Sequence, residues 1–221
     1  MAGKRMLKID YYSDILCVWA WVAQRRIEEL NERFGDQIQW CFHYMDVFGD
    51  TAGKMASQWS DRGGYEGFAS HVSESAAHFH ELKINHSLWR DVQPKTSANA
   101  HLILKAIVLE HGTRVANCFA KTVREAFFLE AVDISDMLVL YKLSDITKLN
   151  TIRIKKFIND GSALAALMND YQKAKNLNIK GSPSYVLDGG RQTLYGNVGY
   201  RVLHANVEEL LKQPENDASW C

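Results

Sequence analysis

The sequence predicts an α/β protein in which a long helical block separates two strand-containing segments. Three observations lead to this fold class. The first 45 residues alternate strand, helix and strand patterns, and residues from about 48 to 178 show helical periodicity as strand signals fade. Strand patterns then return in residues 184–195, before a last helix. With 221 residues, the chain is long enough for one domain with a large insertion, and two separate domains are less expected.

The amino-terminal segment is typical of a β-α-β unit. Residues 7–12 alternate apolar with polar or aromatic side chains and form the first predicted strand, which Ser13-Asp14 ends. An amphipathic helix follows and stops at Gly35, and its buried stripe comprises Ala20, Ala23, Ile27, Leu30 and Phe34. Residues 38–45 are rich in aromatic side chains and predict a second strand. We expect the two strands to be parallel, with the helix crossing over.

The middle of the chain is predicted to be helical. Pro94 and Thr96-Ser97 stand where a helix start is expected, because proline is tolerated in a first turn and a hydroxyl group can cap free N–H groups. The apolar periodicity predicts helices over residues 68–82, 97–111, 115–128, 135–143 and 164–176.

The carboxyl-terminal segment is predicted to be β-β-α. Residues 184–187 and 192–195 have strand patterns, and Asp188-Gly189-Gly190-Arg191 between them is a strong hairpin signal. A helix is expected over residues 200–212, and residues 214–221 are expected to form a flexible tail.

Composition excludes several classes of partner. The chain has 26 basic and 26 acidic residues, and no Lys/Arg run of the kind that tracks phosphates, so no nucleic-acid partner is expected. The first residues run into a strand pattern without an apolar stretch long enough for a signal peptide or a membrane span. We therefore expect a cytoplasmic protein without a membrane partner.

The cysteines and histidines are too scattered for a metal site. Cys17, Cys41, Cys118 and Cys221 have no short paired spacing, which argues against a disulfide framework and a zinc cluster. Cys41 and Cys118 are expected to be small core residues, and Cys221 to be incidental. The histidines at positions 71, 78, 80 and 86 do not share one helix face, so no metal is expected.

Four segments carry a resemblance to a known family. Residues 14–21 are DILCVWAW, residues 96–101 are TSANAH, residues 126–135 are AFFLEAVDIS and residues 180–186 are KGSPSYV. In this order they resemble the Asp-x-x-Cys-Pro-Trp-Cys-Tyr, Asn-Thr-x-x-Ala-His, Phe-x-x-Gly-x-Asp-Ile and Gly-Val-Pro-x-Phe-Val segments of the DsbA-like family. That family also contains 2-hydroxychromene-2-carboxylate isomerase and kappa-class glutathione transferase. The resemblance covers nearly the whole chain, but Val18 and Ala20 replace the family's proline and second cysteine.

The resemblance implies a thioredoxin-like fold with a helical domain inserted between its halves. Residues 5–49 and 179–213 would form the thioredoxin-like domain, and residues 50–178 the helical insertion. It also implies that Pro183 is a cis-proline beside the cysteine. The backbone of Ser182 would then be free to pair with an extended thiol peptide such as glutathione.

Cys17 is the candidate catalytic residue. It lies between the predicted first strand and the helix, where unpaired backbone N–H groups and the helix dipole favour a thiolate. We therefore expect a lowered pKa for its thiol. The alternative is a buried, inert cysteine.

The resemblance also suggests residues that bind glutathione or another substrate. Beside Ser182 and Pro183, we assign Ser13, Trp19, Asn197, Tyr200 and Arg201. Trp19 could shape a pocket around the sulfur or simply pack, and for Trp21 we favour packing. Glutathione-using relatives have a Gly-x-Asp-Arg-like segment near Asn197, but no acid stands there in this chain, so capping of the last helix is an alternative role.

Three functions remain open. Without a second cysteine at position 20, Cys17 cannot be released from a mixed disulfide by its neighbour. Cys17 could exchange with glutathionylated partners, with a second glutathione as co-substrate resolving the disulfide. The site could instead bind glutathione for isomerisation or conjugation, as the isomerase and kappa-class relatives do. A non-catalytic cleft for a peptide or small molecule is the third reading. The resemblance also allows a homodimer.

Overall fold

The structure is a computed structural model and describes residues 6–212. The predicted tail over residues 214–221, with Cys221, lies outside the described residues. Arg5 and Gln213, the outermost residues of the predicted thioredoxin-like segments, also lie outside them.

A four-stranded mixed sheet with the order β2-β1-β3-β4 forms the centre of the molecule. Its strands are β1 (Leu7–Ser13), β2 (Ile38–Tyr44), β3 (Ser184–Leu187) and β4 (Gln192–Tyr195). β1 and β2 are parallel, which confirms the predicted β-α-β unit. β3 is antiparallel to β1 and to β4, so the hairpin of the second segment adds to the edge of the first. The two ends of the chain thus build one sheet.

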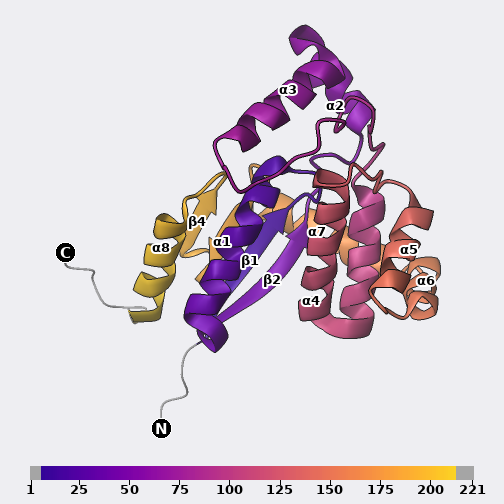
Figure 1. The fold of residues 1–221 in the computed structure, drawn as a ribbon. Helices are drawn as coiled ribbons and strands as arrows, with labels where there is room; N and C mark the ends of the chain where they lie inside the picture. The colour runs from indigo at the N-terminus through magenta and orange to yellow at the C-terminus, as the bar shows by residue number, and fades with distance from the viewer. Residues whose placement is uncertain (1–5, 213–221) are drawn as a thin grey trace.

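Within the part of the chain that the structure describes, eight helices surround this sheet or extend from it; Figure 1 shows their arrangement. They are α1 (Val18–Phe34), α2 (Thr51–Gln58), α3 (Gly64–Ala77), α4 (Ala98–Phe128), α5 (Met137–Ile146), α6 (Thr151–Asn159), α7 (Ser162–Asn176) and α8 (Tyr200–Lys212). Three short 3-10 turns cover Gly35–Gln37, Ser60–Arg62 and Asp188–Gly190.

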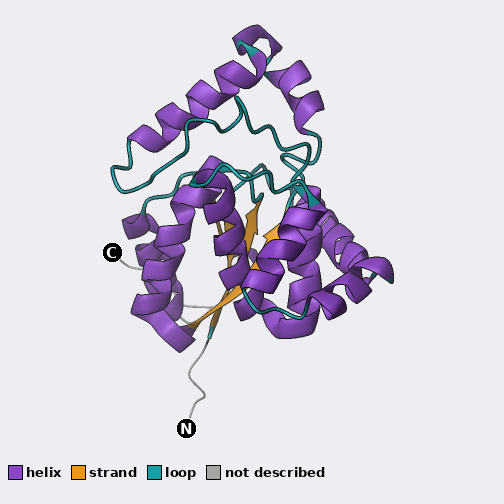
Figure 2. Ribbon diagram, turned by 45° about the vertical axis from the view of Figure 1, so that its right-hand side comes forward, coloured by secondary structure: helices purple, strands orange, loops and turns teal. Residues whose placement is uncertain are grey.

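Helices cover both faces of the sheet because β1 alternates apolar side chains between them. Leu7, Ile9 and Tyr11 pack on one face with α1 and α8. Tyr12 on the other face packs against the region of α7. Figure 2 shows the strands enclosed between these helices. Because both faces of β1 are covered by helices, the strand needs apolar or aromatic side chains at both odd and even positions.

The helical block departs from prediction in three places. The third helix ends at Ala77 instead of residue 82, so residues 78–82 form turns. The helices predicted over 97–111 and 115–128 form one element, α4, interrupted at Gly112, which has φ 82° and ψ 171°. α2 and α6 were not predicted, because they bury only two and one residues respectively and so lack a marked apolar stripe.

The prediction that Cys118 is a core residue is wrong, because its side chain is exposed. α4 buries Ala116, Phe119 and Ala120 on the face that packs inward, and Cys118 falls on the opposite side of the helix. Cys41, on β2, is half-buried instead of fully buried.

The largest apolar cluster joins the start of α1 to the helical block. It contains Leu16 and Trp21 from the first segment together with Phe48, Trp89 and Phe127 from the block. α3 also contacts α1. The junction between β1 and α1 therefore lies where the two parts of the molecule pack together. Within residues 6–212, none of the helices has the length and apolar character to span a bilayer.

Candidate functional site

Cys17 occupies the N-cap of α1. Its backbone is extended, with φ −77° and ψ 119°, and its carbonyl accepts hydrogen bonds from the N–H groups of Ala20 (3.1 Å) and Trp21 (3.0 Å). The helix starts here because Asp14 and Cys17 close a turn, with the Cys17 N–H donating to the Asp14 carbonyl (3.2 Å). This turn places the cysteine side chain at the amino end of the helix.

Ser182 and Pro183, from the carboxyl-terminal part of the chain, lie beside Cys17. The Cys17 Sγ donates to the Ser182 carbonyl at 3.3 Å, and the Asp14 N–H donates to the Ser182 Oγ at 2.9 Å. The Ser182-Pro183 peptide bond is cis. Ser182 therefore contacts the cysteine turn with both its backbone and its side chain. Its carbonyl is engaged by the thiol rather than free.

The expectation of a lowered Cys17 pKa is wrong. Burial raises the pKa of the Cys17 thiol, and the nearby Asp14 carboxylate adds to the rise. The hydrogen bond with Ser182 and the backbone N–H groups of Ala20 and Trp19 lower it, but burial dominates. Only 6% of the residue is exposed. The N–H groups at the start of α1 do stabilise a Cys17 thiolate, but the removal of water around the sulfur destabilises it more.

Asp14 organises the turn from inside. One carboxylate oxygen accepts from the Leu16 N–H (2.9 Å), and the other accepts from the Phe48 N–H (2.9 Å) and the Ser97 hydroxyl (2.7 Å). Burial raises the pKa of Asp14 to about 6, although these hydrogen bonds act to lower it. Asp14 thereby fixes the cysteine turn to the start of the helical block.

His101, whose segment is part of the resemblance, supports the same turn. Its Nε2 accepts a hydrogen bond from the Ile15 N–H at 3.0 Å, and its ring stacks on Tyr44 with centroids 4.8 Å apart. Burial lowers its pKa to about 3, and the positive charge of Arg124 adds to this effect. The imidazole is therefore neutral, and its role is to position the turn.

Ser13 lies beneath the site. It is buried, and its hydroxyl accepts a hydrogen bond from the Arg124 guanidinium at 3.3 Å. Arg124 also donates to the Gln24 side chain at 2.9 Å. The Ser13 hydroxyl is thus used inside the protein, and its assignment as a substrate contact stays a prediction.

The two tryptophans that follow Cys17 have different surroundings. Trp21 is buried and stacks on Phe128, with centroids 5.5 Å apart and an interplanar angle of 5°, which confirms the packing role. Trp19 is only partly buried and meets the edge of Phe79 at 6.5 Å. Trp19 therefore connects the cysteine end of α1 with the turns that follow α3.

The loop after β4 lies beside the cis-proline loop. The Gly196 N–H donates to the Pro183 carbonyl at 2.8 Å. Asn197 is exposed and its side-chain oxygen accepts from Arg26 at 2.6 Å. Tyr200 lines a cavity with Arg26, whereas the exposed Arg201 does not line it. The structure thus brings together Cys17, Ser182 and Pro183. Tyr200 lines a separate cavity, and Asn197 contacts that cavity's Arg26 without lining it.

Two cations near the site were missed in the sequence. Arg26 extends from α1 to the loop after β4, and Lys54 extends from α2 over the ring of Phe48, with its Nζ 5.1 Å from the centroid. Burial lowers the pKa of Lys54, while attraction to Asp14 and Cys17 opposes this shift. No sequence signal distinguishes these two residues from the other basic side chains, because their proximity arises from long-range packing.

Comparison with known proteins agrees with this geometry. The sequence profile of the DSBA-like thioredoxin domain matches residues 8–208. A search of curated protein sequences finds no match.

Three solved structures have a similar fold. A proposed protein disulfide isomerase from Nitrosomonas europaea superposes with a TM-score of 0.78 and 14% identity, covering 94% of this chain and 98% of that one. The cytosolic disulfide reductase DsbM from Pseudomonas aeruginosa, solved with GSH, superposes with a TM-score of 0.71 and 17% identity, covering 93% of this chain and 100% of that one. A 2-hydroxychromene-2-carboxylate isomerase superposes with a TM-score of 0.67 and 15% identity, covering 92% of this chain and 95% of that one. These likenesses establish the thioredoxin-like fold with its helical insertion. By the extent of the profile match, the chain belongs to the family of DSBA-like thioredoxin domains.

Proposed function

We propose that the chain is a thiol-disulfide oxidoreductase that acts through a single cysteine, Cys17, with glutathione as co-substrate. One observation carries the proposal: the Cys17 thiol stands at the N-terminus of α1 against the Ser182 carbonyl of the cis-proline loop, with Ala20 in the position of a second cysteine. Within residues 6–212 the other cysteines, Cys41 on β2 and Cys118 on α4, lie on different elements. Family membership supports an enzyme of this type.

The reaction proceeds in two exchanges. The Cys17 thiol loses its proton to solvent, and the thiolate attacks the glutathione sulfur of a mixed disulfide between a thiol and glutathione. The original S–S bond breaks, and the released thiolate takes up a proton, leaving glutathione bonded to Cys17. The thiolate of a second glutathione then attacks this glutathione sulfur, which regenerates Cys17 and releases glutathione disulfide. The net change converts the mixed disulfide and one reduced glutathione into the free thiol and glutathione disulfide.

The cis-proline loop supports recognition of glutathione as an extended peptide. Backbone groups of such a loop can pair with a peptide in the manner of an added strand. In this protein the Ser182 carbonyl is occupied by the Cys17 S–H, so formation of a mixed disulfide would release that carbonyl at the moment the peptide arrives. A neighbour in the fold comparison, DsbM, was solved with GSH. A reducing, glutathione-containing compartment such as the cytosol suits this chemistry.

A second candidate function follows from the Cys17 environment. Because burial raises the pKa of its thiol, Cys17 is mainly protonated at neutral pH and is a weak nucleophile until substrate binds. A site of this kind could instead hold the thiolate of glutathione itself for isomerisation or conjugation. The fold likeness to 2-hydroxychromene-2-carboxylate isomerase makes an electrophilic or chromene carboxylate substrate a reasonable test compound.

Intact-mass measurement tests the proposal directly. A variant that keeps Cys17 but replaces Cys41, Cys118 and Cys221 by Ser is treated with glutathione disulfide and then with reduced glutathione. We expect one glutathione adduct that forms and is then removed, and no adduct when Cys17 is also replaced by Ser. Turnover of a small glutathione mixed disulfide in the presence of glutathione should show the same dependence on Cys17.

Other results would discriminate the alternatives. Saturable glutathione binding without an adduct, together with turnover of an electrophile or chromene acid, would favour the isomerase or transferase function. Binding without turnover of any of these compounds would favour a non-catalytic site.

A further inference from the structure

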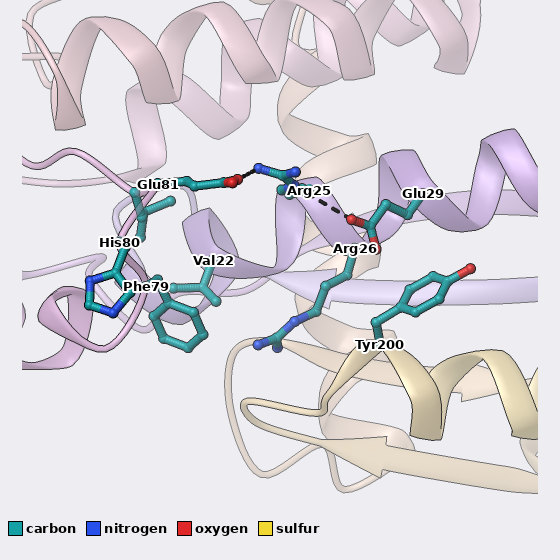
Figure 3. A pocket seen from close by; sticks show the side chains of 9 residues that line it. Val22, Arg25, Arg26, Glu29, Phe79, His80, Glu81 and Tyr200 are labelled. Carbon is teal, nitrogen blue, oxygen red and sulfur yellow. Dashed lines mark ion pairs between the residues drawn. The ribbon is translucent and has the colours of Figure 1, made fainter.

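A cavity of about 410 Å³ opens beside the middle of α1 (Figure 3). Three elements form it: α1, the turns over residues 78–82 and the first residue of α8. Apolar groups dominate its wall, chiefly Val22, Phe79 and Leu82, with the ring of Tyr200 on the far side. Its volume falls in the range of pockets that hold small organic ligands.

One cation in this cavity forms no direct ion pair within the described residues. Arg25 forms an ion pair with Glu81 and a second, at 3.5 Å, with Glu29, so both lining carboxylates are occupied. Arg26 is half-buried and, among residues 6–212, has no carboxylate within ion-pairing distance; Glu29, which pairs with Arg25, attracts it only from farther away. A guanidinium that is partly withdrawn from water without a counter-ion is an unfavourable arrangement, which an anionic ligand would relieve.

The hydrogen bonds of Arg26 leave donors available. Its Nη1 donates to the Asn197 side chain at 2.6 Å and to the Val198 carbonyl at 2.7 Å, which holds the guanidinium in place. In the described residues, its Nε and Nη2 groups have no hydrogen-bond acceptor. The guanidinium carbon lies 5.5 Å from the centroid of Phe79, and Figure 3 shows it between Phe79 and Tyr200. The free edge of a fixed guanidinium can bind a carboxylate through two hydrogen bonds.

The cavity lies along α1 beyond Cys17 and is linked to the cysteine end of the helix by side-chain contacts. Measured along the axis of α1, Val22 lies about 7.5 Å and Arg26 about 13.5 Å beyond Cys17, from the rise of an α-helix. Helical side chains lean toward the N-terminus, which brings the Arg26 guanidinium back toward the cysteine. Phe79 also contacts Trp19, two residues after Cys17. The same Phe79 ring lies 5.5 Å from the Arg26 guanidinium carbon, so Phe79 joins the cavity to the cysteine end of α1.

We propose that this cavity binds the leaving part of the disulfide substrate, and that the substrate is a small organic thiol or disulfide with an aromatic or branched apolar arm and a carboxylate. The arm packs against Phe79, Val22 and Tyr200, and the carboxylate binds Arg26. This assignment rests on the proposed function for the identity of the sulfur chemistry, but binding itself does not require a reactive Cys17.

Non-covalent binding tests the cavity first. In a Cys17→Ser protein, 3-phenylpropionate and its uncharged amide are titrated by calorimetry. We expect the carboxylate to bind at least tenfold more tightly than the amide, because hydrogen bonds to a charged group are stronger than neutral ones. Arg26→Gln should remove this preference while leaving the affinity for the amide unchanged, which also shows that the cavity remains folded.

Arg25→Gln is the matched control, since Arg25 is the next residue on the same helix but is paired with carboxylates. It should keep the preference for the carboxylate. Phe79→Ala should weaken both probes by a similar factor. Equal affinity for the two probes, absence of saturable binding, or the same loss of preference in Arg25→Gln as in Arg26→Gln would overturn the assignment.

Turnover separates the cavity from the proposed function. The wild-type protein is assayed with glutathione mixed disulfides of 4-mercaptophenylacetate and of its amide, and Arg26→Gln should raise KM for the acid by about the factor seen in binding. Probe binding in the Cys17→Ser protein without turnover of either disulfide by the wild type would leave the cavity established and refute the proposed function. Turnover of both disulfides at equal KM, with no probe binding, would support the proposed function and refute the assignment of the cavity.

Discussion

At Cys17, two opposing effects act on the pKa of a single thiol. The helix N-terminus provides backbone N–H groups that favour the thiolate, whereas enclosure between the Asp14 turn and the cis-proline loop removes the water that a thiolate needs. Enclosure dominates, so the pKa of the thiol is raised. The cysteine is held in its protonated form, with its S–H donated to Ser182.

We therefore expect Cys17 to be alkylated slowly at neutral pH. Because the thiolate is the reacting species, the rate with iodoacetamide should keep rising above pH 9, whereas a free cysteine peptide levels off above its pKa of about 8.5. The measurement uses mass spectrometry on a variant in which Cys41, Cys118 and Cys221 are replaced by Ser. A rate that reaches its plateau below pH 7 would contradict the raised pKa.

At the scale of elements, a buried ionic network ties the sheet to the helical block. His43 of β2 contacts Asp10 of β1 through Nε2 at 2.8 Å and Asp170 of α7 through Nδ1 at 2.9 Å. Lys105 of α4 contacts Asp170 at 2.6 Å. Burial lowers the pKa of His43, but its hydrogen bonds to both carboxylates outweigh burial and raise it. Burial likewise raises the pKa of Asp170, and His43 with Lys105 lowers it further than burial raises it.

This network predicts a pH-dependent stability. A raised histidine pKa stabilises the fold fully below the unfolded value of about 6.5, and the contribution is lost as pH rises through the folded pKa. We expect the free energy of unfolding in urea to fall between pH 6.5 and pH 8.5, and to fall less in His43→Gln. The Asp10 and Asp170 carboxylates have the opposite pH dependence, because their contribution to the free energy of unfolding is lost as pH falls below about 4. An unchanged slope in the variant would show that other groups cause the dependence.

The interruption of α4 at Gly112 gives a second prediction for an element. Its φ of 82° and ψ of 171° belong to a region that only glycine occupies readily, although an added Cβ would meet nothing within 4 Å. Gly112→Ala should therefore lower the free energy of unfolding by about 1–3 kcal/mol through backbone strain alone. Gly199 is the matched control, because its added Cβ also meets nothing but its φ is not positive. An equal effect of Gly199→Ala would exclude strain as the cause.

At the scale of the whole molecule, one apolar cluster spans the two predicted domains. Ile15 and Leu16 of the cysteine turn belong to the same cluster as Ile103 and Phe127 of α4. We propose that residues 50–178 fold together with the thioredoxin-like segments rather than as an independent unit, because the insertion and the segments share this core.

Phe127 tests this cooperativity. It is fully buried and packs edge-on against Trp89 and Phe128. Phe127→Ala should lower the free energy of unfolding by about 3–5 kcal/mol, and tryptophan fluorescence and circular dichroism should shift together. Leu138→Ala, at a side chain that is 75% exposed, should change it by less than about 0.5 kcal/mol. Separate transitions for the two probes would indicate independent domains.

Local patterns were sufficient for some elements and insufficient for others. The strands and α8 were predicted because their periodicity and turn residues are short-range properties. α2 and α6 were missed because they bury few side chains, although Asp50 and Asn150 cap them and could have indicated their starts. The helix predicted to reach residue 82 ends at Ala77, and the apolar Phe79 and Leu82 beyond it line the cavity over α1 instead.

The sequence by itself determined the β-α-β and β-β-α segments, the position of Cys17 at a helix start, and the family. It could do so because periodicity, capping and motif spacing are encoded by neighbouring residues. Only the tertiary structure decided the burial that raises the pKa of Cys17, the exposure of Cys118, and the position of Arg26 in the cavity. Solvent exclusion and unpaired charge depend on which distant segments pack together, and a local pattern does not specify that packing.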